Sequence, residues 1–210
     1  MKTAAILISG RGSNMRALVE ADLPVAVKCV ISNRPAAAGL EYAAARGIPT
    51  AIIDHREYAD RAAFDAALAR RIEIAGADLV LLAGFMRVLT EGFVNRHRGR
   101  LINIHPSLLP AFPGLDTHRR AIDSGVRIHG CTVHFVTPAL DAGPIIVQAA
   151  VPVLAGDDEV ALAARVLAQE HRVYPLAVKW VADGTMRLGS DGKVTGDVAA
   201  DPSGCLVVPS

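Results

Sequence analysis

The sequence predicts an α/β protein in which a mostly parallel central sheet is covered by helices on both faces. Short β-branched runs alternate along the chain with Ala-rich stretches of helical length, which is the order of elements expected of such a fold. The runs are apolar at nearly every position, as in Leu79-Val80-Leu81-Leu82-Ala83, and strands of this kind are buried on both faces of a parallel sheet. Ligands of such sheets bind at the carboxyl ends of the strands.

In the first half of the chain, strands and helices are expected to alternate. The β-branched runs predict strands at residues 4–9, 25–32, 50–53 and 79–83. The Ala-rich stretches between them predict helices at residues 14–21, 39–46 and 60–75.

The second half begins with a predicted strand at residues 101–104, followed by a loop, residues 105–114, whose density of proline excludes a helix. A short helix at 117–124, strands at 132–136 and 145–153, and a long helix at 158–182 come next. Asp157 or Asp158 suits the start of the long helix and Gly184 its end. The tail, residues 189–210, has no sustained periodicity, and no function is assigned to it.

Length and composition limit the classes of function. A chain of 210 residues favours one domain, expected at residues 1–188, with a phosphate-binding half at about 1–100 and a second half at about 101–188. The 22 basic and 21 acidic residues nearly cancel, so the charge balance recruits neither nucleic acid nor a membrane. Apolar runs are too short to span a bilayer, and the start is too short for a signal peptide. We therefore expect a cytoplasmic protein.

The cysteines indicate neither a disulfide framework nor a zinc site. Cys29, Cys131 and Cys205 are widely separated, odd in number and without a C-x-x-C spacing. They are interpreted as reduced thiols that are mostly buried.

A glycine-rich loop, Ser9-Gly10-Arg11-Gly12-Ser13-Asn14, lies between the first strand and the first helix. Free backbone N–H groups and the helix dipole favour an anion there, which predicts a phosphate site. A βα turn without a ligand is the alternative. The dinucleotide fingerprint fails because its third glycine position holds Met15 and the second strand ends without an acidic residue. Both features argue against NAD as a ligand, whereas Arg34 leaves NADP open.

Three polar residues follow the strands of the second half. Asn103 and His105 alternate along one strand, so their side chains lie on the same side at its end. There the amide and a protonated imidazole would hold the oxygen of a tetrahedral intermediate. Asp141 lies in a turn between two predicted strands, where it would raise the pKa of a nearby imidazole and accept a proton from an attacking amine. Taken singly, each residue also has a purely structural interpretation, as a turn former or a satisfied strand-end histidine.

Other catalytic patterns are missing from the sequence. It has no G-x-S-x-G elbow, no G-x-x-x-x-G-K-[ST] loop and no H-E-x-x-H pair. His134, on a predicted strand, is a candidate partner of the reactive residues. The remaining histidines are predicted at the surface or in loops: His55, His97, His118, His129 and His171.

Taken together, these motifs resemble the phosphoribosylglycinamide formyltransferases of purine synthesis, over roughly residues 3–188. The motifs occur in the order and spacing of that family, a combination far more specific than any one of them. They are Ile8-Ser9-Gly10-Arg11-Gly12-Ser13-Asn14, Leu82-Ala83-Gly84-Phe85-Met86-Arg87, Ile102-Asn103-Ile104-His105-Pro106-Ser107-Leu108-Leu109-Pro110, Gly130-Cys131-Thr132-Val133-His134-Phe135-Val136 and Leu140-Asp141-Ala142-Gly143-Pro144.

The resemblance implies a three-layer, Rossmann-like formyltransferase fold and assigns roles to individual residues. It implies a catalytic trio of Asn103, His105 and Asp141. The ribonucleotide-binding residues that it implies are Gly12, Ser13, Asn14 and Glu170. The folate-binding residues that it implies are Arg61, Met86, Arg87, Val88, Leu89 and Asn103; from sequence alone, Arg61 reads as a solvated helix charge and Met86 as core.

The implied reaction is direct formyl transfer from 10-formyltetrahydrofolate, as co-substrate, to the amine of glycinamide ribonucleotide, without a metal or a covalent enzyme intermediate. We expect a monomer or a homodimer. Leu167 and Asp116 depart from residues common in the family, which bears on substrate affinity. Formyltetrahydrofolate deformylase is the alternative activity, although it usually carries an additional N-terminal domain. Methionyl-tRNA formyltransferase would need a further C-terminal domain, and a binding module without catalysis would leave the trio unexplained.

Overall fold

The computed structural model describes residues 1–196 and 207–209. The chain forms two compact units, Met1–Asn103 and Ile104–Ser210. The boundary falls inside strand β5 (Leu101–His105), so Asn103 ends the first unit and His105 belongs to the second.

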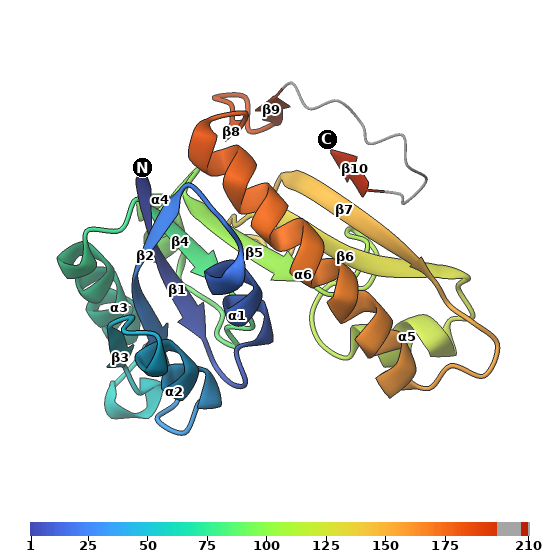
Figure 1. The fold of residues 1–210 in the computed structure, drawn as a ribbon, viewed down its shortest axis with the longest axis horizontal. Helices are drawn as coiled ribbons and strands as arrows, with labels where there is room; N and C mark the ends of the chain where they lie inside the picture. Colours follow the sequence, from blue (N-terminus) through green and yellow to red (C-terminus); the bar gives the residue numbers. More distant parts are fainter. Residues whose placement is uncertain (197–206, 210) are drawn as a thin grey trace. The chain divides into compact units, whose positions relative to one another are not determined.

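The first unit is built on a parallel sheet (Figure 1). Its strands lie in the order β5-β4-β1-β2-β3, and β5 contributes Leu101, Ile102 and Asn103. The order reverses between β1 and β4, because the chain winds first toward β3 and then back toward β5. Such a reversal leaves a crevice at the carboxyl ends of the strands. The other strands are β1 (Lys2–Ile8), β2 (Val25–Ser32), β3 (Thr50–Ile52) and β4 (Leu79–Leu82).

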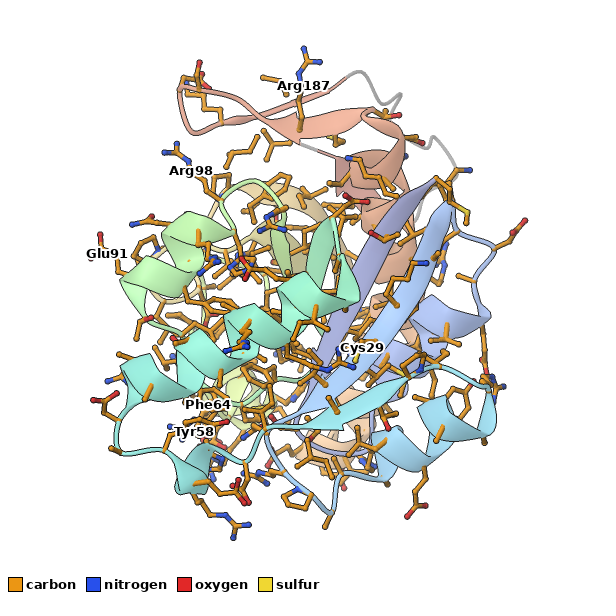
Figure 2. All side chains as sticks on the ribbon, turned by 90° about the vertical axis from the view of Figure 1, so that its left-hand side faces the viewer. Cys29, Tyr58, Phe64, Glu91, Arg98 and Arg187 are labelled. Atoms are coloured by element: carbon orange, nitrogen blue, oxygen red, sulfur yellow. The ribbon has the colours of Figure 1, made fainter. Side chains whose placement is uncertain are left out.

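Helices cover both faces of this sheet. Right-handed crossovers place α1 (Ser13–Glu20) and α2 (Ala38–Ala45) on one face. They place α3 (Arg61–Ala75) and α4 (Glu91–Arg96) on the other. Figure 2 shows α3 and α4 in front of the strands, with the rings of Tyr58 and Phe64 in edge contact, their centroids 5.8 Å apart.

Local signals fix the ends of α3. The Asp60 side chain accepts a hydrogen bond from the backbone N–H of Ala63 at 2.8 Å, which satisfies a free donor of the first turn. Gly76 ends the helix at φ 62°, a left-handed conformation that favours glycine.

The second unit contains a long antiparallel pair, β6 (Ile128–Phe135) and β7 (Ile145–Pro152). The backbone of β10 (Val207–Pro209) pairs antiparallel with β7. The 25-residue helix α6 (Glu159–Asp183) packs across β6 and β7 (Figure 1). The other elements are α5 (Thr117–Asp123) and the hairpin of β8 (Met186–Leu188) and β9 (Val194–Gly196).

The predicted strands and helices are present, and most of their ends lie within two residues of the predicted ones. The largest shift is in β6, which begins at Ile128 instead of residue 132. Sequence reasoning missed α4, the short 3₁₀ helix η1 (His55–Glu57) and the β8–β9 hairpin, because elements this short show too little periodicity. Of the predicted tail, residues 189–196 and 207–209 are described, and they hold β9 and β10.

Two of the three cysteines are buried thiols, as the sequence predicts. Cys29 and Cys131 are free and buried, and burial raises the pKa of both thiols. Cys205 lies outside the described residues. No helix within the described part of the chain is both long and apolar enough to cross a membrane.

Candidate active site

The glycine-rich loop lies where β1 ends and α1 begins. Gly12 has φ 74°, and a Cβ atom on it would lie 2.9 Å from Met15 Cε and 3.1 Å from Gly39 Cα. Only glycine therefore fits the turn, and Met15 fills the adjacent space as a fully buried side chain. Ser13 and Asn14 form the first turn of α1, the part of a helix whose backbone N–H groups can bind an anion.

Asn103 lies at the same edge of the first unit's sheet as this loop. It pairs with Leu82 of β4, which pairs in turn with Leu7 of β1. Neighbouring strands are separated by about 4.8 Å, so Asn103 lies roughly 10 Å from β1 at the level where β1 leads into the loop. Asn103 is therefore on the crevice side of the sheet, one strand beyond the reversal in strand order.

His105 and Asp141 meet in the second unit. Nδ1 of His105 lies 3.5 Å from Oδ2 of Asp141, and both side chains are nearly buried. Nε2 of the same ring lies 3.1 Å from the carbonyl oxygen of Phe112. A carbonyl can only accept, so Nε2 carries the proton of that bond, and a second proton on Nδ1 would face the carboxylate.

The turn that carries Asp141 has an unusual backbone. Asp141 has φ 48°, in the left-handed region, and its Oδ2 accepts a hydrogen bond from the backbone N–H of Gly114 at 2.8 Å. Gly143 passes so close to β6 that a Cβ atom would lie 1.7 Å from the carbonyl oxygen of Phe135. The Asp-Ala-Gly-Pro sequence thus allows the turn to lie against β6 and hold the carboxylate beside His105.

His134 is a buried neighbour of this pair, as expected for a partner of the reactive residues. Burial lowers the pKa of His134, and the nearby charges of Asp141 and His105 act on it in opposite directions. Its Nδ1 lies 3.0 Å from the carbonyl oxygen of Phe135.

Thr132 holds the proline-rich loop against the second unit's sheet. Its fully buried hydroxyl donates to the carbonyl of Ser107 at 2.7 Å and accepts from the N–H of Leu109 at 3.0 Å. Gln148 of β7 donates to that hydroxyl and to the carbonyl of Leu109. Sequence reasoning gave neither residue a role, although both lie on predicted strands, where a polar side chain within a buried run is the available signal.

The predicted binding residues fall in both units. In the first unit, Arg61 is exposed at the start of α3, and Met86 and Val88 are exposed after β4. Arg87 is half-buried and Leu89 is buried. Glu170 lies in the second unit as a buried residue of α6, and its charge adds to the effect of burial in raising the pKa of Cys131.

The prediction of surface histidines was wrong for two of them. His97 is completely buried, with its ring 4.3 Å from that of Phe93. His129 is only 1% exposed and contacts the ring of His118. His129 was assigned to a loop because the predicted strand began three residues later. In the structure it belongs to β6, and burial lowers its pKa to about 4.

The reversed strand order and the glycine-rich βα loop of the first unit place the chain among the Rossmann-like α/β proteins. The chain belongs to the formyl transferase family, whose model matches residues 2–178. This confirms the family predicted from the motifs.

Similar proteins agree with this assignment. The chain is 48% identical to the phosphoribosylglycinamide formyltransferase of Escherichia coli, over 87% of this chain and 88% of that protein. It is 47% identical to the human trifunctional purine biosynthetic protein adenosine-3 over 90% of this chain, and it spans 19% of that protein's length. The solved glycinamide ribonucleotide transformylase 1 of Symbiobacterium toebii has a TM-score of 0.90, 47% identity and coverage of 94% of this chain and 95% of that one. The Rossmann-like α/β fold with a mostly parallel central sheet is thereby confirmed.

Proposed function

We propose that this chain transfers the formyl group of 10-formyltetrahydrofolate to the amine of 5-phosphoribosylglycinamide. The products are formylglycinamide ribonucleotide and tetrahydrofolate, within purine biosynthesis. The observation that carries the proposal is the His105–Asp141 pair, 3.5 Å apart, two residues along β5 from Asn103. The proposal is supported by the 48% identity of this chain, over 87% of its length, to the phosphoribosylglycinamide formyltransferase of Escherichia coli.

The reaction requires one bond to form and one to break. The glycinamide nitrogen attacks the formyl carbon to give a tetrahedral intermediate, and the bond from that carbon to the folate nitrogen then breaks. The attacking amine loses a proton and the folate nitrogen gains one, so the net change is a proton moved between the two nitrogens. A group that accepts and returns a proton therefore accelerates both the attack of the amine and the departure of the folate nitrogen.

Asn103 and His105 are suited to stabilise the oxyanion. The Asn103 amide is a hydrogen-bond donor, and Nε2–H of His105 would be a second one in exchange for its bond to the carbonyl of Phe112. A donor aimed at a developing oxyanion contributes about 3 kcal/mol in the transition state. Asp141, whose Oδ2 lies 3.5 Å from the His105 ring, is the proposed proton shuttle, directly or through water.

The proposed binding residues are those that the family resemblance implies. Gly12, Ser13 and Asn14 supply the helix-terminal N–H groups for the ribonucleotide phosphate, and Glu170 is the proposed ligand of the ribose hydroxyls. The proposed folate site uses Asn103, Arg61 and the 86–89 segment. The exposed apolar side chains of Met86 and Val88 offer a surface for a flat aromatic ring.

One assay separates the transferase from its alternative. Purified protein is mixed with 10-formyltetrahydrofolate, with and without glycinamide ribonucleotide, and the deformylated folate is followed by absorbance. We expect folate release only when the amine is present, with one formylated ribonucleotide per folate released. Release without the amine would instead identify a deformylase, and no release under either condition would identify a binding protein.

A further inference from the structure

The segment between β4 and α4, residues 85–90, has no regular secondary structure of its own. A backbone in this state needs other partners for its polar groups. Two are buried side chains: the hydroxyl of Ser9 accepts from the N–H of Met86 at 2.7 Å, and Oδ2 of Asp65 accepts from the N–H of Thr90 at 2.6 Å. The segment is thus attached at one end to the loop after β1 and at the other to α3.

At the first attachment, the Ser9 hydroxyl can act only as the acceptor of the hydrogen bond from Met86. The Ser9 hydroxyl donates to Oδ1 of Asn33 at 2.5 Å, so its proton is engaged there and a lone pair faces Met86. The Asn33 side chain is itself held by a contact of 3.2 Å between its Nδ2 and Nδ1 of His55. Ser9 and Asn33 are 4% and 2% exposed, so water does not compete for these bonds.

The second attachment places a carboxylate inside the protein. Asp65 is 3% exposed on α3, and among residues 1–196 its Oδ1 has no hydrogen-bond partner. A buried carboxylate is costly unless it is well bonded, so core packing alone does not account for this residue. Its bond to Thr90 fixes the point where α4 begins, because the Thr90 hydroxyl accepts from the N–H of Phe93.

Between the two attachments, the backbone groups are left for a ligand. Arg87, Val88 and Leu89 make no hydrogen bond within the described part of the first unit. Their carbonyl and N–H groups lie next to the exposed side chains of Met86 and Val88. A segment held at both ends presents these groups in one arrangement, so less conformational entropy is lost when a ligand binds.

We infer that Ser9 and Asp65 are positioning residues that hold the 86–90 segment in the conformation that binds the folate. The inference rests on the proposed function, since that function makes this segment a folate site. Neither residue is proposed to touch the folate; each acts on the segment through one backbone N–H group.

The test measures binding of tetrahydrofolate and of glycinamide ribonucleotide separately, by calorimetry, in Ser9→Ala and Asp65→Ala. We expect the dissociation constant for tetrahydrofolate to rise about tenfold in each variant, the equivalent of one net hydrogen bond. The dissociation constant for the ribonucleotide should change less than twofold in Asp65→Ala, because Asp65 lies on α3, outside the glycine-rich loop. Asp65→Asn keeps an acceptor for Thr90 and should recover most of the affinity that Asp65→Ala loses.

The double variant provides a second readout. Because both residues hold one segment, releasing either end already loosens it, and the combined loss should be smaller than the product of the two single losses. Thr3→Val is the matched control. It removes side-chain hydrogen bonds to Gly76 and Asp78 at the opposite ends of the strands, and it should lower stability without changing folate affinity.

The outcomes separate the inference from the function on which it rests. If the unchanged protein does not bind tetrahydrofolate, the proposed function fails. If it binds and both alanine variants bind equally well, only the inference fails. Should a variant fold poorly, hydrogen exchange of Met86 and Thr90 in the remaining variant decides the question, because unchanged protection there would contradict the positioning role.

Discussion

The backbone conformation and the side chain of Asp141 both contribute to its contact with His105. Its left-handed conformation, φ 48°, is strained for most residues but tolerated by Asp and Asn, whose short polar side chains bond locally. The conformation turns the carboxylate toward both the N–H of Gly114 and the ring of His105. Replacement by alanine would therefore disturb the turn as well as the charge.

Asp141→Asn is the cleaner test of the carboxylate. Asparagine tolerates the conformation and keeps an acceptor for Gly114, while the negative charge beside His105 disappears. We expect turnover to fall by about 10²- to 10⁴-fold, the usual contribution of acid–base catalysis, with little change in melting temperature. Asp116→Asn, compared at saturating substrate concentrations because Asp116 bears on substrate affinity, is the matched control, since Asp116 is also left-handed, at φ 56°, but exposed. Equal activity in both variants would remove Asp141 from the mechanism.

The hydroxyl of Thr132 is predicted to stabilise the proline-rich loop. Thr132→Val keeps the shape but leaves the buried N–H of Leu109 and the carbonyl of Ser107 without this partner. We expect a loss of about 1–3 kcal/mol in the free energy of unfolding by urea. Thr137→Val removes an exposed hydroxyl with a single long bond and should change stability by less than 0.5 kcal/mol, roughly the limit for surface changes. Similar losses in the two variants would contradict the role of Thr132.

The two long helices were the easiest elements to predict. Asp60 and Gly76 bound α3, and the ends of α6 were expected from Asp158 and Gly184. Beside the cap of α6, Asp157 binds Arg165 and the N–H of Leu154, and these bonds lower the pKa of Asp157 to about 2. The helix that covers β6 and β7 is therefore anchored at its start by two neighbouring carboxylates.

Removing the cap of α6 should weaken the second unit. Asp158→Ala deletes the acceptor for the N–H of Ala161, and we expect a loss of about 1 kcal/mol in the free energy of unfolding. Asp158→Asn retains a capping oxygen and should stay close to the unchanged protein. The urea concentration at the midpoint of unfolding is measured for the unchanged protein and for both variants. An unchanged midpoint in Asp158→Ala would show that the cap does not contribute to stability.

Across the whole molecule, buried histidines make folding sensitive to acid. Burial is the main cause that lowers the pKa of four imidazoles below their ordinary value: His97, His118, His129 and His134. These rings stay neutral in the folded protein when the unfolded chain already binds protons. Because the unfolded state then holds more protons, stability rises with pH in this range.

The resulting loss of stability has a defined pH window. It should begin as the pH falls through about 6.5, the ordinary pKa of histidine, and continue to about 4, where His129 becomes protonated in the folded state. For His129 alone the loss reaches about 3 kcal/mol. Urea unfolding between pH 7.5 and 4.5 measures this loss. In His129→Leu, the free energy of unfolding should depend less steeply on pH. A stability that does not change over this interval would refute the prediction.

Strand ends and βα loops could be located from the sequence because they have fixed positions in a parallel sheet. The glycine spacing located the loop between β1 and α1, and alternation along the strand is the basis for predicting that Asn103 and His105 share a side. The environment of His129 could not be predicted in this way. It depends on where β6 begins, and that start is set by pairing of Ile128 with Pro152 of β7, which is distant in sequence.

The order of strands and helices, the caps and the chemical groups of the site were decided by the sequence alone, because each depends on residues close together in the chain. Folding in three dimensions decided which of these groups meet. The contact of Asp141 with His105, the hold of Thr132 on the proline-rich loop, and the attachment of the 86–90 segment to Ser9 and Asp65 all join residues from separate elements. Such contacts depend on tertiary packing, which local patterns do not encode.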